Sequence, residues 1–127
     1  MRAAPDWQAR GVLNMAETMT ESEFLAVADG IMKKVEAQAD RWFEERDIDV
    51  EAERNGGVLT LTFESGVQVV INGQPPLQEM WVAAPRGGFH YRLEAGQWRD
   101  TRGGPPLAQA LSEIVSEAAG QALSVEL

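Results

Sequence analysis

NGGVLTLTF, residues 55–63, is the stretch of sequence that decides the fold. Its first dipeptide, Asn55-Gly56, predicts a β-hairpin, because a type I′ turn requires positive φ at both central positions. After the turn, apolar residues alternate with threonines as far as Phe63, which is typical of a strand with one buried and one solvent-exposed face. Before the turn, residues 48–53 alternate apolar and acidic side chains in the same way. The stretch therefore predicts two antiparallel strands joined by a tight turn.

The same pattern of short strands continues after the hairpin. Four further strands are expected, at residues 67–72, 78–84, 89–94 and 97–100. Turns rich in Gly and Pro separate them, and Gly73 to Pro76 is predicted to end the third strand of the sheet, because proline cannot donate to a ladder.

Two helices are expected to flank the strands. Thr20-Glu21-Ser22-Glu23 matches a capping box, and apolar residues then recur at three- and four-residue steps as far as Trp42. A second apolar stripe begins at Leu107, and Gly120 is expected to end that helix. Because links of hairpin length do not permit parallel crossovers, the sequence predicts an α+β fold with two helices packed on one face of an antiparallel sheet of about six strands.

Length and composition limit the organisation and the possible chemistry. Residues 1–18 have no clear period and are expected to form a disordered extension, whereas 19–127 are expected to form a single domain. The chain has no cysteine, which excludes cysteine-ligated clusters held by this chain alone. A net charge of −9 argues against nucleic acid as a partner. With no apolar run long enough for a membrane span or a signal peptide, we expect a cytoplasmic protein that does not enter the membrane.

Acidic residues gather in the middle of the chain. Between residues 36 and 53, eight carboxylates and two arginines give a net charge of −6. The carboxylates belong to Glu36, Asp40, Glu44, Glu45, Asp47, Asp49, Glu51 and Glu53. Oxygen ligands from a helix and a neighbouring strand suit hard cations such as Mg²⁺, Ca²⁺, Mn²⁺ and iron, although no preformed cage is expected. A solvated surface that discourages edge-to-edge aggregation is an equally weighted alternative.

Within this group, three acids share one face of the first helix. Glu36, Asp40 and Glu44 lie at four-residue steps and are expected mostly to face one another, which is unfavourable. Arg41 is a candidate local partner for Asp40 that would compete with a cation.

Two aromatic residues of the later strands are further candidates. If Met80 and Val82 face the helices, Trp81 is left on the open face of the sheet, where an exposed Trp can serve as an interface contact. The reversed parity, with Trp81 in the core, is equally compatible with the pattern. His90 lies between two aromatic residues and is expected to be structural or at the surface, with a role as one cation ligand as the alternative.

Taken together, the chain from about Met19 onward resembles the bacterial members of the frataxin family. The residues that carry the resemblance are Glu23-Phe24, the acidic helix end, Asn55-Gly56-Gly57 with the strand to Phe63, Ile71-Asn72-Gly73-Gln74-Pro75-Pro76-Leu77 before Trp81, and Gly87-Gly88-Phe89-His90-Tyr91. The resemblance implies an α-β sandwich whose acidic ridge binds ferrous and ferric iron weakly. By position, the ridge corresponds to the eight carboxylates named above, and a partner-binding surface corresponds to Asn72, Gln74 and Trp81.

The resemblance also implies a function in iron–sulfur cluster assembly. A protein of this family is expected to modulate assembly or supply iron for it by docking on the complex of cysteine desulfurase and scaffold protein. We expect a monomer, with iron-dependent oligomers as the alternative, and a regulator or iron chaperone instead of an enzyme. The alternative from another class is a ferroxidase that oxidises Fe²⁺ at the ridge, and a purely structural acidic domain is a third.

Overall fold

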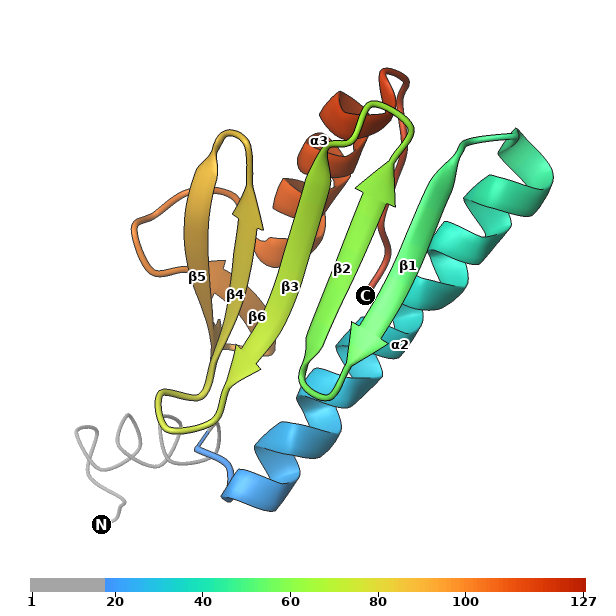
Figure 1. Cartoon of the computed structure of the whole chain (residues 1–127). Coiled ribbons are helices and arrows are strands. Elements are labelled where there is room, and N and C mark those ends of the chain that lie inside the picture. Colours follow the sequence, from blue (N-terminus) through green and yellow to red (C-terminus); the bar gives the residue numbers. More distant parts are fainter. Residues whose placement is uncertain (1–17) are drawn as a thin grey trace, which may run out of the picture.

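The computed structural model describes residues 18–127 and has the element order expected from the sequence (Figure 1). The elements are α2 (Glu21–Arg46), β1 (Val50–Asn55), β2 (Val58–Phe63), β3 (Gln68–Gln74), β4 (Glu79–Ala84), β5 (Gly87–Glu94), β6 (Gln97–Asp100) and α3 (Leu107–Ala119). The strands form one antiparallel sheet in the order β1-β2-β3-β4-β5-β6, and both helices lie behind it in Figure 1. The predicted α+β fold is confirmed. Residues 1–17, most of the expected extension, lie outside the described residues.

Helix α2 begins where the capping box predicted. The Thr20 hydroxyl accepts a hydrogen bond from the backbone N–H of Glu23, and the Glu23 carboxylate accepts one from the backbone N–H of Thr20. The helix ends at Asp47, which adopts a left-handed conformation with φ of 57°. The backbone N–H groups of Asp47 and Ile48 both bond the Trp42 carbonyl, and this turn directs the chain from α2 into β1.

The hairpin turn lies one residue later than we predicted. Asn55 still belongs to β1 and pairs with Val58, so Gly56 and Gly57 are the central residues of the turn. Gly56 has φ of 58°, and Gly57 is outside the positive-φ region. A turn whose first central residue has a positive φ and whose second has a negative φ fits type II′. This turn type also matches the right-handed twist of the strands.

Strand β3 is longer than we predicted, because Gly73 and Gln74 continue it and pair with Met80 and Glu79. A Cβ atom at Gly73 would lie 3.1 Å from the Ala28 Cβ of α2. The absence of a side chain therefore lets the helix cross close above the sheet at this point, which is why the glycine lies inside a strand.

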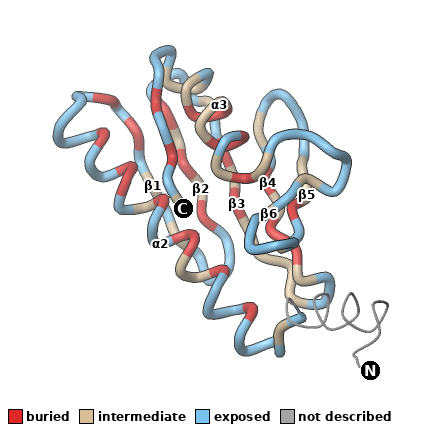
Figure 2. The backbone as a smooth tube through the Cα atoms, turned by 180° about the vertical axis from the view of Figure 1, so that it is seen from behind, coloured by how far each residue is buried: buried red, intermediate tan, exposed pale blue. Residues whose placement is uncertain are grey.

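The core fills the layer between the sheet and the helices, as the buried stripes in Figure 2 show. Its fully buried members include Phe24, Val35, Leu59, Ile71 and Leu111. They come from both helices and from the face of the sheet that the alternating pattern predicted. The opposite face of the sheet is not covered by any element of the described chain.

Residues after α3 close the groove between the two helices. Leu123 and Val125 are buried, and their backbone groups are bonded by two serines of α3. The Ser116 hydroxyl accepts from Leu123 N at 2.8 Å and donates to Leu123 O at 3.0 Å, while the Ser112 hydroxyl accepts from Val125 N at 2.8 Å. From the other side, the Gln38 amide of α2 pairs with the backbone of residue 126. The segment 121–127 is therefore an integral part of the packing.

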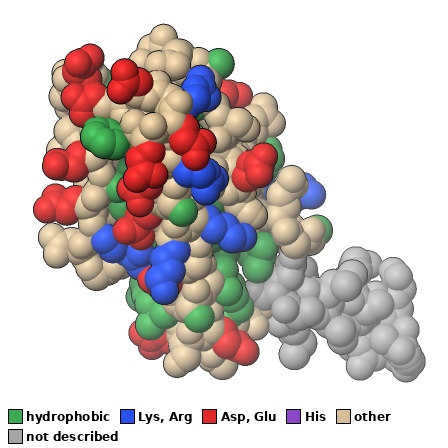
Figure 3. Space-filling model, turned by 90° about the vertical axis from the view of Figure 1, so that its right-hand side faces the viewer, with side chains coloured by type: hydrophobic (Ala, Val, Ile, Leu, Met, Phe, Trp, Pro, Cys, Tyr) green, Lys and Arg blue, Asp and Glu red, His purple; other side chains and the backbone are tan. Residues whose placement is uncertain are grey.

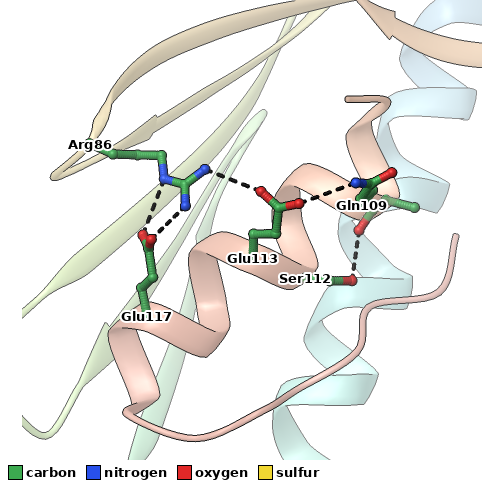
Figure 4. A network of polar contacts seen from close by, with 6 residues as sticks. Arg86, Gln109, Ser112, Glu113 and Glu117 are labelled. Atoms are coloured by element: carbon green, nitrogen blue, oxygen red, sulfur yellow. Dashed lines mark hydrogen bonds and ion pairs between the residues drawn. The ribbon is translucent and has the colours of Figure 1, made fainter. Parts of the chain in front are cut away.

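A polar network ties α3 to the turn between β4 and β5 (Figure 4). Arg86 in that turn forms ion pairs with Glu113 and Glu117, and Gln109 donates a hydrogen bond to Glu113. The hydrogen bond from Arg86 lowers the pKa of Glu117. This contact fixes α3 to the β4–β5 end of the sheet, on the same face as α2.

Candidate functional site

The acidic ridge lies on the edge of the molecule formed by α2 and β1. We use this name for Glu36, Asp40, Glu44, Glu45, Asp47, Asp49, Glu51 and Glu53. The first four belong to the second half of α2, the next two to the connection into β1, and the last two to the solvent-facing side of β1. Figure 3 shows acidic side chains gathered on the upper part of this side of the molecule, with Lys and Arg side chains among and below them.

Most of the ridge is freely accessible to water. Apart from Glu36, which is half-buried, every carboxylate of the ridge belongs to an exposed residue. Phe43 lies among them on α2 with 57% of its surface exposed, a feature that the sequence analysis did not identify. An exposed apolar ring within the acidic segment gives the ridge an apolar contact as well as a charge.

One cation that lies just outside the acidic segment neutralises the start of the ridge. Arg54, at the end of β1, faces the helix side and forms ion pairs with Glu36 at 2.8 Å and with Asp29. The hydrogen bond from Arg54, followed by that from Lys33, lowers the pKa of Asp29. The prediction that Glu36 mainly faces other acids is therefore wrong, because the strand brings a guanidinium to it. Arg41, the expected local partner of Asp40, makes no ion pair within residues 18–127.

The structure places the ridge carboxylates along one edge without converging them on a point. Among residues 18–127, no group of three or more His, Asp or Glu side chains is arranged to hold a metal ion. A cation would therefore meet one or two protein carboxylates and keep most of its water ligands.

A second surface lies on the open face of the sheet. Met80 and Val82 are buried against the helices, so the parity that leaves Trp81 on the open face is the one observed. Asn72 pairs with Trp81 across β3 and β4, and its Oδ1 accepts a hydrogen bond from Gln74 Nε2 at 2.7 Å. The three residues that the resemblance assigned to partner binding thus lie together, and we call them the sheet patch.

The sheet patch continues onto β5 through a ring stack. Trp81 and His90 are cross-strand neighbours whose rings are parallel within 3°, with centroids 4.1 Å apart. The Trp81 Nε1–H donates to Glu79 Oε1 at 2.9 Å, and Arg92 pairs with the other oxygen of Glu79. Sequence reasoning placed His90 at the surface or in a structural role and did not identify Glu79 or Arg92.

Glu79 is an unusual member of this group because its side chain is only 6% exposed. Burial by itself would raise the pKa of Glu79, but the hydrogen bonds from Trp81 and Arg92, together with the charge of Arg92, hold the pKa below its ordinary value. The carboxylate is therefore ionised and bonded beneath the half-buried rings.

Fold and surface together define a class: a small α-β sandwich with two helices on one sheet face, an acidic edge and an uncovered sheet face that bears a Trp. No helix in the described part of the chain is both long and apolar enough to cross a membrane. A family model described as "Frataxin-like domain" matches residues 17–121.

Relatives of the same class are similar along most of the chain. The "Iron-sulfur cluster assembly protein CyaY" of Bordetella parapertussis is 58% identical over 109 residues, which cover 86% of this chain and 100% of the relative. The protein of the same description from Paraburkholderia phymatum is 43% identical over 107 residues, covering 84% and 98%. The chain belongs to the frataxin family, in its bacterial CyaY-type branch.

Solved structures of the family agree with this assignment. The frataxin of Psychromonas ingrahamii superposes with a TM-score of 0.74 at 33% identity and covers 86% of this chain and 100% of its own. Trimeric frataxin of Saccharomyces cerevisiae, solved in complex with ferrous iron, has a TM-score of 0.61 at 28% identity and covers 82% and 89%.

Proposed function

We propose that this protein binds iron weakly on its acidic ridge and modulates or supplies iron for iron–sulfur cluster assembly. In this proposal it docks on the complex of cysteine desulfurase and scaffold protein. The relatives described as iron–sulfur cluster assembly proteins support the cellular role, and the ferrous complex of the yeast frataxin supports iron as the bound metal. The single observation that carries the proposal is the ridge itself, a row of exposed carboxylates on folded elements.

Iron acts in this proposal as cargo or effector, held by the oxygen atoms of the ridge. Carboxylate oxygens are suitable ligands for Fe²⁺ and for other hard divalent cations. Because the ridge offers each ion few ligands at once, binding is expected to be weak and rapidly reversible. Each bound ion removes part of the like-charge repulsion along α2 and β1 and so changes the charge that a partner meets.

Docking on a basic partner would use the ridge and the sheet patch differently. The net negative edge attracts Lys and Arg over a distance of about one Debye length, roughly 10 Å at 0.1 M salt, and so speeds and orients encounter. The sheet patch then supplies short-range contact, because Trp81 offers a large rigid surface beside polar groups. The β1 end of the ridge and the sheet patch belong to one sheet, with β2 between them, which allows one protein complex to contact both.

The ferroxidase alternative requires a different geometry. Oxidation of Fe²⁺ at a two-iron centre normally uses bridging carboxylates that are preorganised around both ions. The ridge carboxylates of the described chain are spread along an edge, which favours binding over catalysis. Oxygen uptake at a fixed ratio of iron to protein separates the two functions, because turnover above the uncatalysed rate would support the enzyme.

Matched charge removal tests the docking proposal. The ridge variant Asp40→Asn, Glu44→Gln, Asp49→Asn and the control variant Glu21→Gln, Glu94→Gln, Glu126→Gln remove the same charge from exposed residues. If each ridge charge contributes about 0.5 kcal/mol, affinity for the desulfurase should fall roughly tenfold in the ridge variant at low salt. The control should bind nearly as the wild type does. Equal affinity of the two variants would refute the electrostatic part of the proposal.

Metal binding can be located independently of the partner. Anaerobic titration with Fe²⁺, followed by backbone NMR, should broaden signals at residues 36–53 in the wild type and in the control variant. The ridge variant should show weaker broadening. Broadening elsewhere, or no saturable binding at all, would contradict the iron site and would leave a structural acidic domain as the better description.

A further inference from the structure

The buried carboxylate beneath the sheet patch is a feature that iron binding does not explain. Glu79 belongs to the open face of the sheet by strand parity, since it alternates with buried Met80, yet only 4% of the residue is exposed. Its cross-strand neighbours are Gln74 on β3 and Arg92 on β5. The carboxylate thus lies under the row of side chains that forms the patch.

Burial of an ionised carboxylate is costly unless its oxygens are bonded. In this protein both oxygens have a partner: Oε1 accepts from the indole N–H of Trp81, and Oε2 is paired with the Arg92 guanidinium. His90 Nδ1 lies 3.6 Å from Oε1, close to the same atom that the indole bonds. One buried group therefore contacts every ring of the stack and the cation beside it.

This arrangement restricts the orientation of Trp81. An exposed Trp on a sheet can change its χ angles, and an interface contact that must be ordered on binding costs affinity. In this structure the indole is held at its edge by Glu79 and on one face by His90, at 4.1 Å between centroids. The hydrogen bond also uses the indole's one donor, so a partner meets the apolar part of the ring.

We infer that Glu79 is a positioning residue for partner binding, which fixes the Trp81–His90 stack in its docking orientation and leaves an apolar ring surface for the partner. The inference rests on the proposed function, in which Trp81 contacts the assembly complex. It adds that the partner offers an apolar group, and no hydrogen-bond acceptor, to the indole. Arg92 balances the buried charge and so keeps Glu79 ionised and in place.

Two variants of Glu79 separate positioning from simple stability. Glu79→Met fills a similar volume but cannot accept the indole hydrogen bond, whereas Glu79→Gln keeps an acceptor oxygen without the charge. The first readout needs no partner: the indole N–H signal of Trp81 in ¹H–¹⁵N spectra, assigned with Trp81→Phe. We expect faster hydrogen exchange and a shifted signal in Glu79→Met, and near-wild-type behaviour in Glu79→Gln. Urea unfolding of each variant defines conditions in which all of them are folded.

The second readout is affinity for the desulfurase–scaffold complex. We expect Glu79→Met to weaken binding by roughly tenfold, the effect of losing one hydrogen bond to a charged group, and Glu79→Gln to restore most of it. In the Trp81→Phe background, Glu79→Met should have little further effect, because a positioning residue acts through the side chain that it holds.

The outcomes distinguish this inference from the proposed function. If Glu79→Met leaves the Trp81 signal unchanged, or weakens binding equally with and without Trp81, the inference is overturned. If Trp81→Phe binds the complex as the wild type does, the sheet patch of the proposed function is wrong. The indole signal would then still decide whether Glu79 holds the stack.

Discussion

Replacing Gly73 with alanine tests how closely α2 must approach the sheet. The new Cβ would lie 3.1 Å from Ala28 Cβ and 3.2 Å from Phe24 Cε2, both shorter than the 3.4 Å at which ordinary contact begins. The helix or the strand must therefore move by a few tenths of an ångström. Both contacted atoms belong to buried residues of α2, so the strain cannot be relieved by moving a side chain into solvent.

The expected magnitude is a balance of two effects. Overpacking of a well-packed core costs about 1–3 kcal/mol. Alanine lowers the conformational entropy lost on folding relative to glycine, which returns about 0.5–1 kcal/mol. We therefore expect Gly73→Ala to reduce the free energy of unfolding by about 0.5–2 kcal/mol. Because Gly73 separates Asn72 from Gln74, the same displacement should weaken docking at the sheet patch.

Urea unfolding of a small set of variants measures this effect. Gly30→Ala is the control, since Gly30 lies on α2, the helix that Gly73 faces, and a Cβ there meets nothing within 4 Å. It should stabilise the protein by about 0.5–1 kcal/mol. Ala28→Gly combined with Gly73→Ala should be less destabilising than the sum of the single changes. A neutral or stabilising Gly73→Ala, or strict additivity in that pair, would refute the close-approach argument.

Three further outcomes are expected. Arg54→Met should release Glu36 and increase the affinity of the ridge for Fe²⁺ or Mn²⁺, measured by anaerobic calorimetry, and unchanged affinity would show that Arg54 does not compete with cations. The single tyrosine, Tyr91, should resist ionisation, because burial raises its pKa to about 12. The folded state holds the phenol proton more tightly than the unfolded state does, so the free energy of unfolding should fall as pH rises from about 10 towards 12. Phenolate absorbance measures the ionisation, and circular dichroism measures the unfolding. Ser116→Ala removes both bonds to Leu123 and should cost about 1–3 kcal/mol in a urea titration, whereas a loss below about 0.5 kcal/mol would mean that apolar contacts alone hold the segment.

Local patterns in the sequence predicted most of the fold. The capping box at Thr20 and the alternation after Gly57 are short-range signals, because each can be recognised from residues that are close together in the sequence. Such inferences succeed because period and polarity already contain the information. The pattern of β4 left two parities open, and the structure has the one in which Met80 and Val82 are buried and Trp81 lies on the open face.

Features that depend on distant segments were missed. Gly73 was expected to end a strand, because the helix that requires a glycine there lies far away in sequence. Arg54 was left out of the charge balance, since only pairing of β1 beside α2 brings it to Glu36. Glu79 was overlooked for the same reason: its partner Arg92 comes from the next strand. These residues share no pattern that a linear inspection could recognise.

The closure of the helix groove by residues 121–127 has a consequence for biosynthesis. A ribosome makes this segment after every other described element, so a nascent chain can assemble its sheet and both helices while the groove between them is still open to solvent. The apolar lining of that groove, and the serine hydroxyls that bond Leu123 and Val125 in the folded chain, stay open to solvent until the segment packs. A chain that lacks residues 121–127 would therefore leave part of its core uncovered and two serine hydroxyls of α3 without these backbone partners.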